Sequence, residues 1–421
     1  MSATTAPTEE HPAGTAADGG LGQAWRDYTG RVRGGELGAL PSVLALISLV
    51  IIFTALQSDV FFKPGNFANL ITQSSTIIVL AMGLIYVLLL GEIDLSAGFA
   101  AGTCAAVLAV TLTQRGWPLP LALVATIATG VGIGLFIGVI VAKLGIPSFV
   151  VTLAMFLALQ GFVLIIIGEG GTIPIRDQQI RAIMNSNMTP LLGWLLFAVV
   201  VGGYTLMTYR QLSQRRKTGL VTQSPQVWLV KVIALALLLG FAVLVLNLER
   251  SSKPELTSIK GVPYVVVVIL LLLIGLTYNL TRTSFGRHVY AVGGNAEAAR
   301  RAGISVARIR IYCFIACSTL AAVAGILFAS KDQSVSPSTG GSTTLLYAVG
   351  AAVIGGTSLF GGRGKIRDAI LGGLVVAVIG NGLPLITDAS GIQFIVTGLV
   401  LLIAASVDAL SRRRAQASGR A

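Results

Sequence analysis

The sequence contains very little charge. Only 11% of its 421 residues are Asp, Glu, Lys or Arg, whereas 54% are hydrophobic. Soluble domains carry about a quarter charged residues. A chain with so little charge cannot cover a large soluble protein with polar surface, and its repeated apolar runs of about 20 residues are long enough to cross a bilayer. The composition therefore predicts an all-α fold, that of a polytopic integral membrane protein.

Cysteine and histidine are also scarce. Cys104, Cys313 and Cys317 all lie within apolar runs, which argues against a disulfide framework and favours helix packing over metal binding. His11 and His288 cannot make a His-based metal cluster. The sequence has neither a G-x-x-x-x-G-K-[ST] phosphate-binding motif nor an evident His-Asp-Ser grouping. We expect no catalytic residue, cofactor or metal in this chain.

Positive charge is the exception to this scarcity, since the net charge is +13. The basic residues lie in the gaps between apolar runs and not on one face rich in aromatic residues, so nucleic acid is not the expected partner. Lys and Arg cluster in the cytoplasmic loops of membrane proteins. Alternating the segments from a cytoplasmic N-terminus places most of the 30 Lys and Arg residues inside and predicts that both termini are cytoplasmic.

The chain divides into three parts. Residues 1–39 are rich in Ala, Thr, Gly and Pro and predict a disordered cytoplasmic tail, not a signal peptide. Residues 40–410 form the transmembrane domain, and 411–421 a basic cytoplasmic tail. Because 94–113 begins with a charge and 344–360 is short, the number of crossings stays open between about 10 and 12. The candidate spans are 40–57, 68–90, 94–113, 119–142, 147–167, 190–209, 228–248, 261–281, 309–330, 344–360, 366–386 and 391–410.

A basic insert at 282–308 separates two of these spans and is predicted to be cytoplasmic. Gly293 and Gly294 are expected to break the chain, Asn295 to cap a short helix over 296–302, and Gly303 to end it. Ala298, Ala299 and Ala302 would give this helix a face of small residues. Such a helix suits a groove on another protein, but its arginines equally suit anionic lipid head groups.

The insert, "FGRHVYAVGGNAEAARRAGIS", resembles the cytoplasmic loop of bacterial ABC importer permeases. The match is to the ribose/xylose/arabinose/galactose permease family, which is related to the branched-chain amino-acid permeases. "GEIDLSAG" at 91–98 and "VIGGTSLFGGRGKIRDAILGG" at 353–373 match as well. In order, these three motifs are specific, and with the surrounding hydropathy the resemblance covers about residues 40–410. The extra pair of spans around the loop "YRQLSQRRKTG" is similar to the xylose-type members, which favours a pentose.

The resemblance implies a permease without enzymatic activity that works with partners. These are a separate ABC ATPase subunit that binds ATP, a sugar-binding protein and a second permease chain, expected to be a second copy, in a bacterial inner membrane. The insert would contain the coupling helix that the ATPase grips. The residues expected to couple to the ATPase are Gly286, Arg287, Gly293, Gly294, Asn295, Glu297, Ala298, Ala299 and Gly303.

Polar residues within the apolar segments are candidates for the translocation pathway. Glu92 and Asp94 interrupt a segment with no positive charge within reach in the sequence, and ionisable groups at membrane depth are costly. Asp94 equally suits a cap for the next helix, next to Ser96, and Glu92 the membrane interface. Asn381 and Gln160 would bond either a sugar hydroxyl or a freed backbone carbonyl.

Two further inferences come from the apolar segments. Gly130, Gly134 and Gly138 recur at four-residue spacing, which predicts close helix packing and not a substrate role. The alternative function is an ion-coupled secondary transporter or a channel for a small polar solute. It would require buried charge pairs or an ion relay, and the sequence offers only Glu92 and Asp94 for these.

Overall fold

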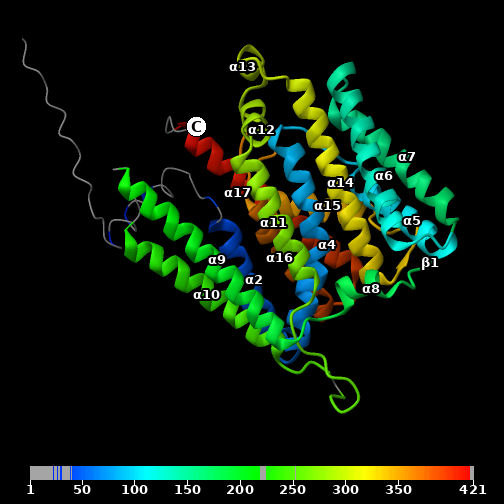
Figure 1. Ribbon diagram of the computed structural model, residues 1–421, viewed down its shortest axis with the longest axis vertical. Helices are drawn as coiled ribbons and strands as arrows, with labels where there is room; N and C mark the ends of the chain where they lie inside the picture. Colours follow the sequence, from blue (N-terminus) through cyan, green and yellow to red (C-terminus); the bar gives the residue numbers. More distant parts are fainter. Residues whose placement is uncertain are drawn as a thin grey trace, which may run out of the picture.

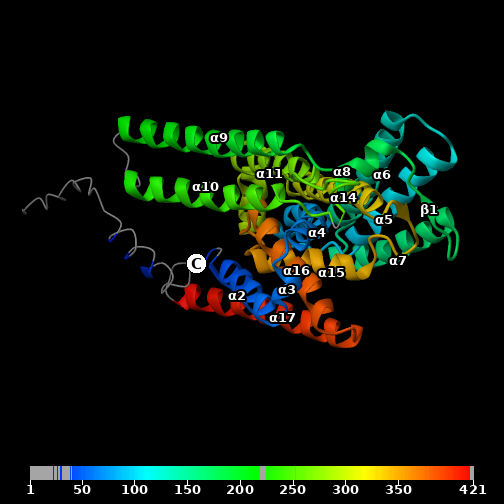
Figure 2. The ribbon, with the colours of Figure 1, turned by 90° about the horizontal axis from the view of Figure 1, so that it is seen from below.

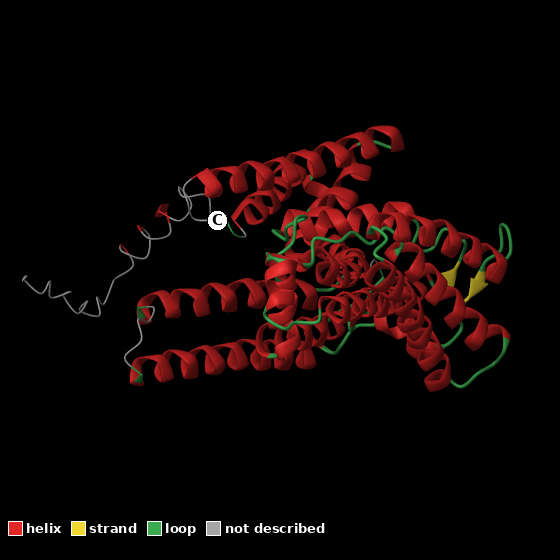
Figure 3. Ribbon diagram, turned by 90° about the horizontal axis from the view of Figure 1, so that it is seen from above, coloured by secondary structure: helices red, strands yellow, loops and turns green. Residues whose placement is uncertain are grey.

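The computed structural model describes residues 22, 26, 29, 30, 38, 40–218, 224–251 and 253–417. Regular structure in these residues is almost entirely helical, and the only strands among them are the short β1 (Ile173–Pro174) and β2 (Ser334–Val335), as Figure 3 shows. The prediction of an all-α polytopic membrane protein is confirmed.

Each of the twelve predicted spans coincides with a helix. Within the described residues, nine helices are long and apolar enough to cross a membrane, and three further apolar helices are shorter. The short ones are α2, α15 and the start of α17. The twelve helices are α2 (Leu40–Leu56), α4 (Pro64–Leu89), α5 (Ala97–Ala109), α6 (Leu119–Val139), α7 (Ser148–Ile167), α9 (Pro190–Lys217), α10 (Pro225–Asn247), α11 (Val265–Arg282), α14 (Val306–Asp332), α15 (Ser342–Gly355), α16 (Ile366–Ile386) and α17 (Ser390–Ala417).

Shorter elements connect them. Two π-helical turns extend α5 and α6, and four short helices lie in the connections. These elements are η1 (Val110–Gln114), η2 (Ile140–Leu144), α3 (Ser58–Phe61), α8 (Gln178–Asn185), α12 (Ser284–Gly294) and α13 (Ala296–Arg301).

Helix α14 lies at the centre of the bundle and packs against α4, α5 and α6 (Figure 1). Small residues allow the close approach. A Cβ atom on Gly134 of α6 would lie only 2.4 Å from the Phe314 carbonyl oxygen of α14. Gly130 and Gly138 meet the same helix at Ser318 and Ile311. The predicted packing face of these three glycines is therefore present, and it fixes α6 to the central helix.

Helices α9 and α10 form a hairpin that projects from the side of the bundle (Figure 2). Trp228 of α10 donates an indole N–H hydrogen bond to Thr208 of α9 at 2.9 Å. The prediction that "YRQLSQRRKTG" is a loop was wrong as far as Lys217, because α9 remains helical to that residue. Arg, Gln and Lys are strong helix formers, so the basic stretch continues the apolar helix beyond the span.

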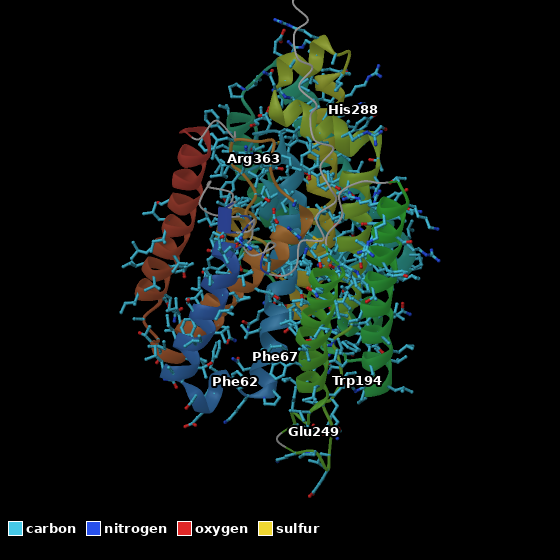
Figure 4. The ribbon with its side chains drawn as sticks, turned by 90° about the vertical axis from the view of Figure 1, so that its left-hand side faces the viewer. Phe62, Phe67, Trp194, Glu249, His288 and Arg363 are labelled. Atoms are coloured by element: carbon cyan, nitrogen blue, oxygen red, sulfur yellow. The ribbon has the colours of Figure 1, made fainter. Side chains whose placement is uncertain are left out.

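The two ends of the bundle are distinct. His288 and Arg363 lie at the end that α12 and α13 form, and Phe62, Trp194 and Glu249 lie at the opposite end (Figure 4). We call these the α13 end and the Glu249 end. The antiparallel pair β1–β2 joins the connection after α7 to the connection after α14.

Helix α15 does not cross the bilayer alone, whereas α5 reaches the length of a span only together with η1. The 14 residues of α15 correspond to about 20 Å, against a hydrocarbon core of about 30 Å. The N-terminal ends of α5 and α15 meet, since a Cβ atom on Gly98 would lie 2.6 Å from the Gly340 carbonyl oxygen and 3.1 Å from Leu345. The suspected irregularity of 94–113 and 344–360 thus corresponds to two helices that begin inside the bundle.

The tails are largely beyond the described residues. The interpretation of 1–39 as a disordered cytoplasmic tail falls almost wholly on residues outside the description and stays a prediction. The backbone of 411–417 continues α17 as a helix, so this part of the predicted basic tail is not a separate segment.

Candidate functional site

Helix α12 begins the site by folding back on the end of α11. Thr283 caps it by accepting a hydrogen bond from the Gly286 N–H at 3.1 Å. Gly286 is buried so closely against Leu280 that a Cβ atom would lie 2.1 Å from its carbonyl oxygen. Val289 and Val292 are buried on the same side, whereas Arg287 faces outward. The helix is therefore amphipathic and fixed to the bundle along one face.

Helix α13 follows with the cap that the sequence predicts. The Asn295 side chain accepts a hydrogen bond from the Ala298 N–H at 2.9 Å, and Gly303 takes the left-handed backbone, with φ of 83°. Gly303 therefore ends this turn as expected. Glu297 forms ion pairs with Arg300 at 3.0 Å and Arg301 at 3.5 Å.

Not all of the predicted small face is open to a partner. Ala298 and Ala302 are exposed, but Ala299 is 5% exposed and packs into the core of its own chain. Ala299 thus anchors α13, because the hydrogen bond from Ile304 N–H to its carbonyl also ties it to the following turn. The surface that α13 presents outward combines two alanines with the charges of Glu297, Arg300 and Arg301.

A cluster of close backbone contacts fixes this insert to two other connections. We call Gly91, Gly293, Gly361 and Gly362 the glycine junction. The Gly362 N–H donates to the Leu89 carbonyl at 2.8 Å, and a Cβ atom on Gly293 would lie 1.8 Å from the same oxygen. Gly361, at φ of 87°, approaches the Gly293 carbonyl and the Gly91 N–H. All three motifs found in the sequence therefore meet at the end of α4.

This contact corrects one prediction. Gly293 and Gly294 were expected to break the chain, but they are the last residues of α12, and the break falls at Asn295. Gly293 is glycine because the carbonyl of Leu89 occupies the space of its side chain. Gly294, in contrast, has nothing within 4 Å of an added Cβ atom and faces outward.

Glu92 and Arg310 link the connection after α4 to α14. The Glu92 carboxylate lies 3.0 Å from Nε of Arg310, and their side chains are 15% and 31% exposed. The expectation that no positive charge reaches Glu92 was wrong, because Arg310 is distant in sequence and comes from the start of the helix that follows α13. The pair therefore connects the start of α14, directly after the insert, to the break before α5.

The connection 356–365 forms the third wall of the site. The Asp368 carboxylate accepts hydrogen bonds from the Lys365 N–H at 2.7 Å and from the Thr357 hydroxyl at 3.2 Å. The Tyr290 hydroxyl donates to the Gly364 carbonyl at 2.7 Å. Burial, and secondly the charge of Asp368, raise the pKa of Tyr290, so its hydroxyl keeps this proton. The connection joins α15 to α16.

Asp94 lies just before α5 and is fully buried. Its carboxylate accepts hydrogen bonds from the Ser96 N–H at 2.9 Å and the Ser96 hydroxyl at 2.6 Å. The backbone at Ile93 is satisfied from α7, by the hydroxyls of Ser148 and Thr152. Freed backbone groups need such partners at membrane depth. Ser96 is the N-cap residue of α5, but its side chain makes no capping hydrogen bond, and Asp94 binds Ser96 itself. Neither residue lines a pocket described in this structure.

Asn381 and Gln160 lie apart from this junction and from one another. The Asn381 amide donates to the Gln73 side chain of α4 at 3.4 Å, a partner that was neither of the two expected. Gln160 faces outward from α7 and lines a cavity at the start of α15. The expected set of pathway residues therefore occupies three separate places.

Within the described residues, no group of three or more His, Cys, Asp or Glu side chains is arranged to hold a metal ion. The bundle of apolar helices defines the class of the protein as a multi-pass membrane protein. A contact at α13 can reach α4, α5, α14, α15 and α16 directly, through the glycine junction, the Glu92–Arg310 pair and the 356–365 connection.

Comparison with known proteins agrees with this class. The family model described as "Branched-chain amino acid transport system / permease component" matches residues 66–405. The chain is 34% identical to the xylose transport system permease protein XylH of Escherichia coli (strain K12), over 88% of this chain and 92% of that protein. It is 32% identical to XylH of Haemophilus influenzae, over 88% and 96% of the two chains, and 30% identical to the ribose import permease protein RbsC of Escherichia coli (strain K12), over 87% and 92%.

No solved structure matches this chain. The extent of the family match and the identity to these relatives are sufficient to assign the family. The protein belongs to the branched-chain amino acid transport system permease family, and the resemblance to ABC sugar permeases seen in its three motifs is confirmed.

Proposed function

We propose that this chain is the membrane-spanning subunit of an ATP-driven importer for a monosaccharide, in particular a pentose such as xylose. Relatives named for xylose and ribose transport support the substrate class. ATP would be bound by a separate ATPase subunit, and sugar would be delivered by a sugar-binding protein at the Glu249 end. A second copy of the chain would complete the pathway.

One observation carries the coupling role. Helix α13 is exposed at the extremity of the bundle, and the preceding α12 is fixed by the glycine junction to the connections that start α5 and α16. Force applied to α13 by a partner would therefore act on several spans at once. A helix bound only to lipid head groups would not need this rigid connection to the bundle.

The orientation follows from the same proposal. With the ATPase at the α13 end, this end is cytoplasmic, and both α2 and α17 would start or finish there. The basic residues of α9, from Arg210 to Lys217, would then lie at the cytoplasmic end of their helix, as the distribution of positive charge requires.

The test is reconstitution with the cognate ATPase and sugar-binding protein in liposomes. We expect the ATPase to co-purify with the permease and sugar to stimulate ATP hydrolysis and uptake. Ala298→Trp and Gly294→Glu should uncouple hydrolysis from transport without unfolding, because both positions are exposed. Leu206→Trp, on the exposed face of α9 away from both ends of the bundle, is the control for a bulky surface residue.

Two results would contradict the proposal. Normal uptake by both α13-end variants would remove the docking role. Sugar uptake by the permease alone, driven by an ion gradient without nucleotide, would instead establish a secondary transporter.

A further inference from the structure

A cavity of about 400 Å³ opens where the start of α15 meets α5 and α7. Its wall combines apolar residues with side chains that can form hydrogen bonds. Gln160 contributes an amide, and Phe99 contributes an aromatic ring. Hydroxyls come from Ser338, Ser342, Thr343 and Thr344.

The cavity lies within the membrane-spanning part of the bundle. Gln160 is well inside α7, 12 residues after the first residue of that helix, Ser148, which places it about 18 Å along the helix axis. The start of α15 is at the depth of the start of α5, as the contact of Gly98 with Gly340 shows. Gln160 is therefore about 18 Å from one end of α7 and about 10 Å from the other, inside the apolar part of the bundle.

Contact between this wall and lipid would be energetically unfavourable. Gln160, Ser338, Ser342 and Thr343 are exposed on the surface of the chain. A polar group without a hydrogen-bond partner costs several kcal/mol in hydrocarbon. The N-cap of α15 is Gly341, so no side chain caps the first turn of that helix. This face must therefore border a polar space or another polar surface.

The chemistry of the lining residues indicates which class of molecule the cavity can bind. None of the lining residues is charged, so the cavity offers nothing to balance an ion. Hydroxyl and amide groups both donate and accept hydrogen bonds, as the hydroxyls of a sugar do. The volume lies in the lower part of the range of about 300–1,000 Å³ that is typical of small-molecule sites.

We propose that this cavity is the site that a monosaccharide occupies while it crosses the membrane, with Gln160 and Thr343 among its hydrogen-bond partners. The inference rests on the proposed function and adds to it the place where the sugar contacts the chain. A second copy of the permease would close the open side of the cavity.

Two substitutions remove the polar groups with little change of shape. Gln160→Leu and Thr343→Val should each raise KM for ATP-dependent xylose uptake about threefold to tenfold, the expected effect of one lost hydrogen bond between neutral groups. ATP hydrolysis in the absence of sugar should not change. Gln226→Leu, on the exposed surface of α10, is the matched control and should leave KM as in the wild type.

An independent measurement is labelling of Thr343→Cys. The native cysteines Cys104, Cys313 and Cys317 are buried and give a low background. We expect a charged, water-soluble methanethiosulfonate reagent to modify Cys at position 343, and xylose to slow the modification. Labelling by apolar reagents only, or disulfide formation between two copies without any effect of xylose, would show a lipid-facing or subunit-facing wall and overturn the proposal.

The experiments distinguish a failure of the cavity assignment from a failure of the proposed importer function. If the wild-type complex transports xylose with ATP but both substitutions leave KM unchanged, the cavity assignment is wrong and the importer function stands. If the wild-type complex shows no ATP-dependent uptake, the proposed function is wrong. The labelling experiment then still decides the cavity, since protection by xylose supports it and lack of protection refutes it.

Discussion

Replacing Gly293 with alanine tests the glycine junction directly. The added Cβ atom would lie 1.8 Å from the Leu89 carbonyl oxygen and 2.9 Å from the Gly362 nitrogen. Because such contacts are not found below 3.0 Å, α12 and α4 would have to separate by about 1.2 Å at this point. Both neighbours are backbone atoms, so no side-chain rotation can relieve the overlap.

The free-energy cost follows from three contributions. Overpacking in a well-packed region costs about 1–3 kcal/mol. Loss of the hydrogen bond from the Gly362 N–H to Leu89, now 2.8 Å long, costs about 1 kcal/mol more. Alanine returns about 0.5–1 kcal/mol through its better helix propensity. We therefore expect Gly293→Ala to destabilise the protein by about 1–3 kcal/mol.

Gly294→Ala is a control of unusual quality, because it makes the same chemical change one residue further along the helix. Nothing lies within 4 Å of its added Cβ atom. Its stability should equal or slightly exceed that of the wild type. Thermal unfolding of the purified permease, followed by tryptophan fluorescence, measures both variants.

Of these two variants, only the destabilised one should lose coupling between ATP hydrolysis and transport. In liposomes with the ATPase, Gly293→Ala should reduce sugar-stimulated ATP hydrolysis, because the displaced α12 no longer holds α13 against the bundle. Gly294→Ala should retain it. Equal melting temperatures for the two variants would refute the argument that the junction is closed by backbone contact.

Three further outcomes are expected from other parts of the molecule. Gly134→Ala should lower the melting temperature, because its Cβ atom would lie 2.4 Å from the Phe314 carbonyl oxygen, whereas Gly132→Ala, with open space around it, should not; equal effects would contradict the α6–α14 packing. A double-mutant cycle of Glu92→Gln and Arg310→Met should give an interaction free energy of about 0.5–3 kcal/mol, and strict additivity would show that the pair contributes nothing. Hydrogen bonds from the Ser258 hydroxyl and from backbone N–H groups lower the pKa of Glu249 from 4.5 to about 2, so the protection of the 253–259 amides relative to their intrinsic exchange rate should be high above pH 4.5 and fall as the pH falls toward 2. The variant Glu249→Gln should show low protection at every pH, and a pH-independent protection in the wild type would argue against this role of the carboxylate.

The spans were predictable because hydrophobic length alone determines them. All twelve apolar segments correspond to helices, since a chain in a bilayer must satisfy its backbone internally. The cap at Asn295 and the end at Gly303 were also predictable, because both depend on neighbouring residues only. Rules that use only neighbouring residues were therefore sufficient to predict helix caps and helix ends.

Contacts between distant segments were not predictable from one sequence. Gly293 has the composition of a chain break, and only the position of Leu89 explains why it is the end of a packed helix instead. Glu92 similarly finds its partner in Arg310, more than 200 residues later. Ala298, Ala299 and Ala302 are the same residue type, yet of these three only Ala299 is buried. The cavity next to Gln160 depends on the meeting of α5 with α15, which no single motif signals.

Helix α14 has a mechanical consequence. It starts at Val306, three residues after Gly303, and continues without a break to Asp332, a length of about 40 Å. Directly beyond its far end the chain enters β2 and then the turn that carries Ser338 and Gly341. Helix α14 thus connects the neighbourhood of α13 rigidly to the cavity next to Gln160, so a small rotation of the helix at one end displaces the other end.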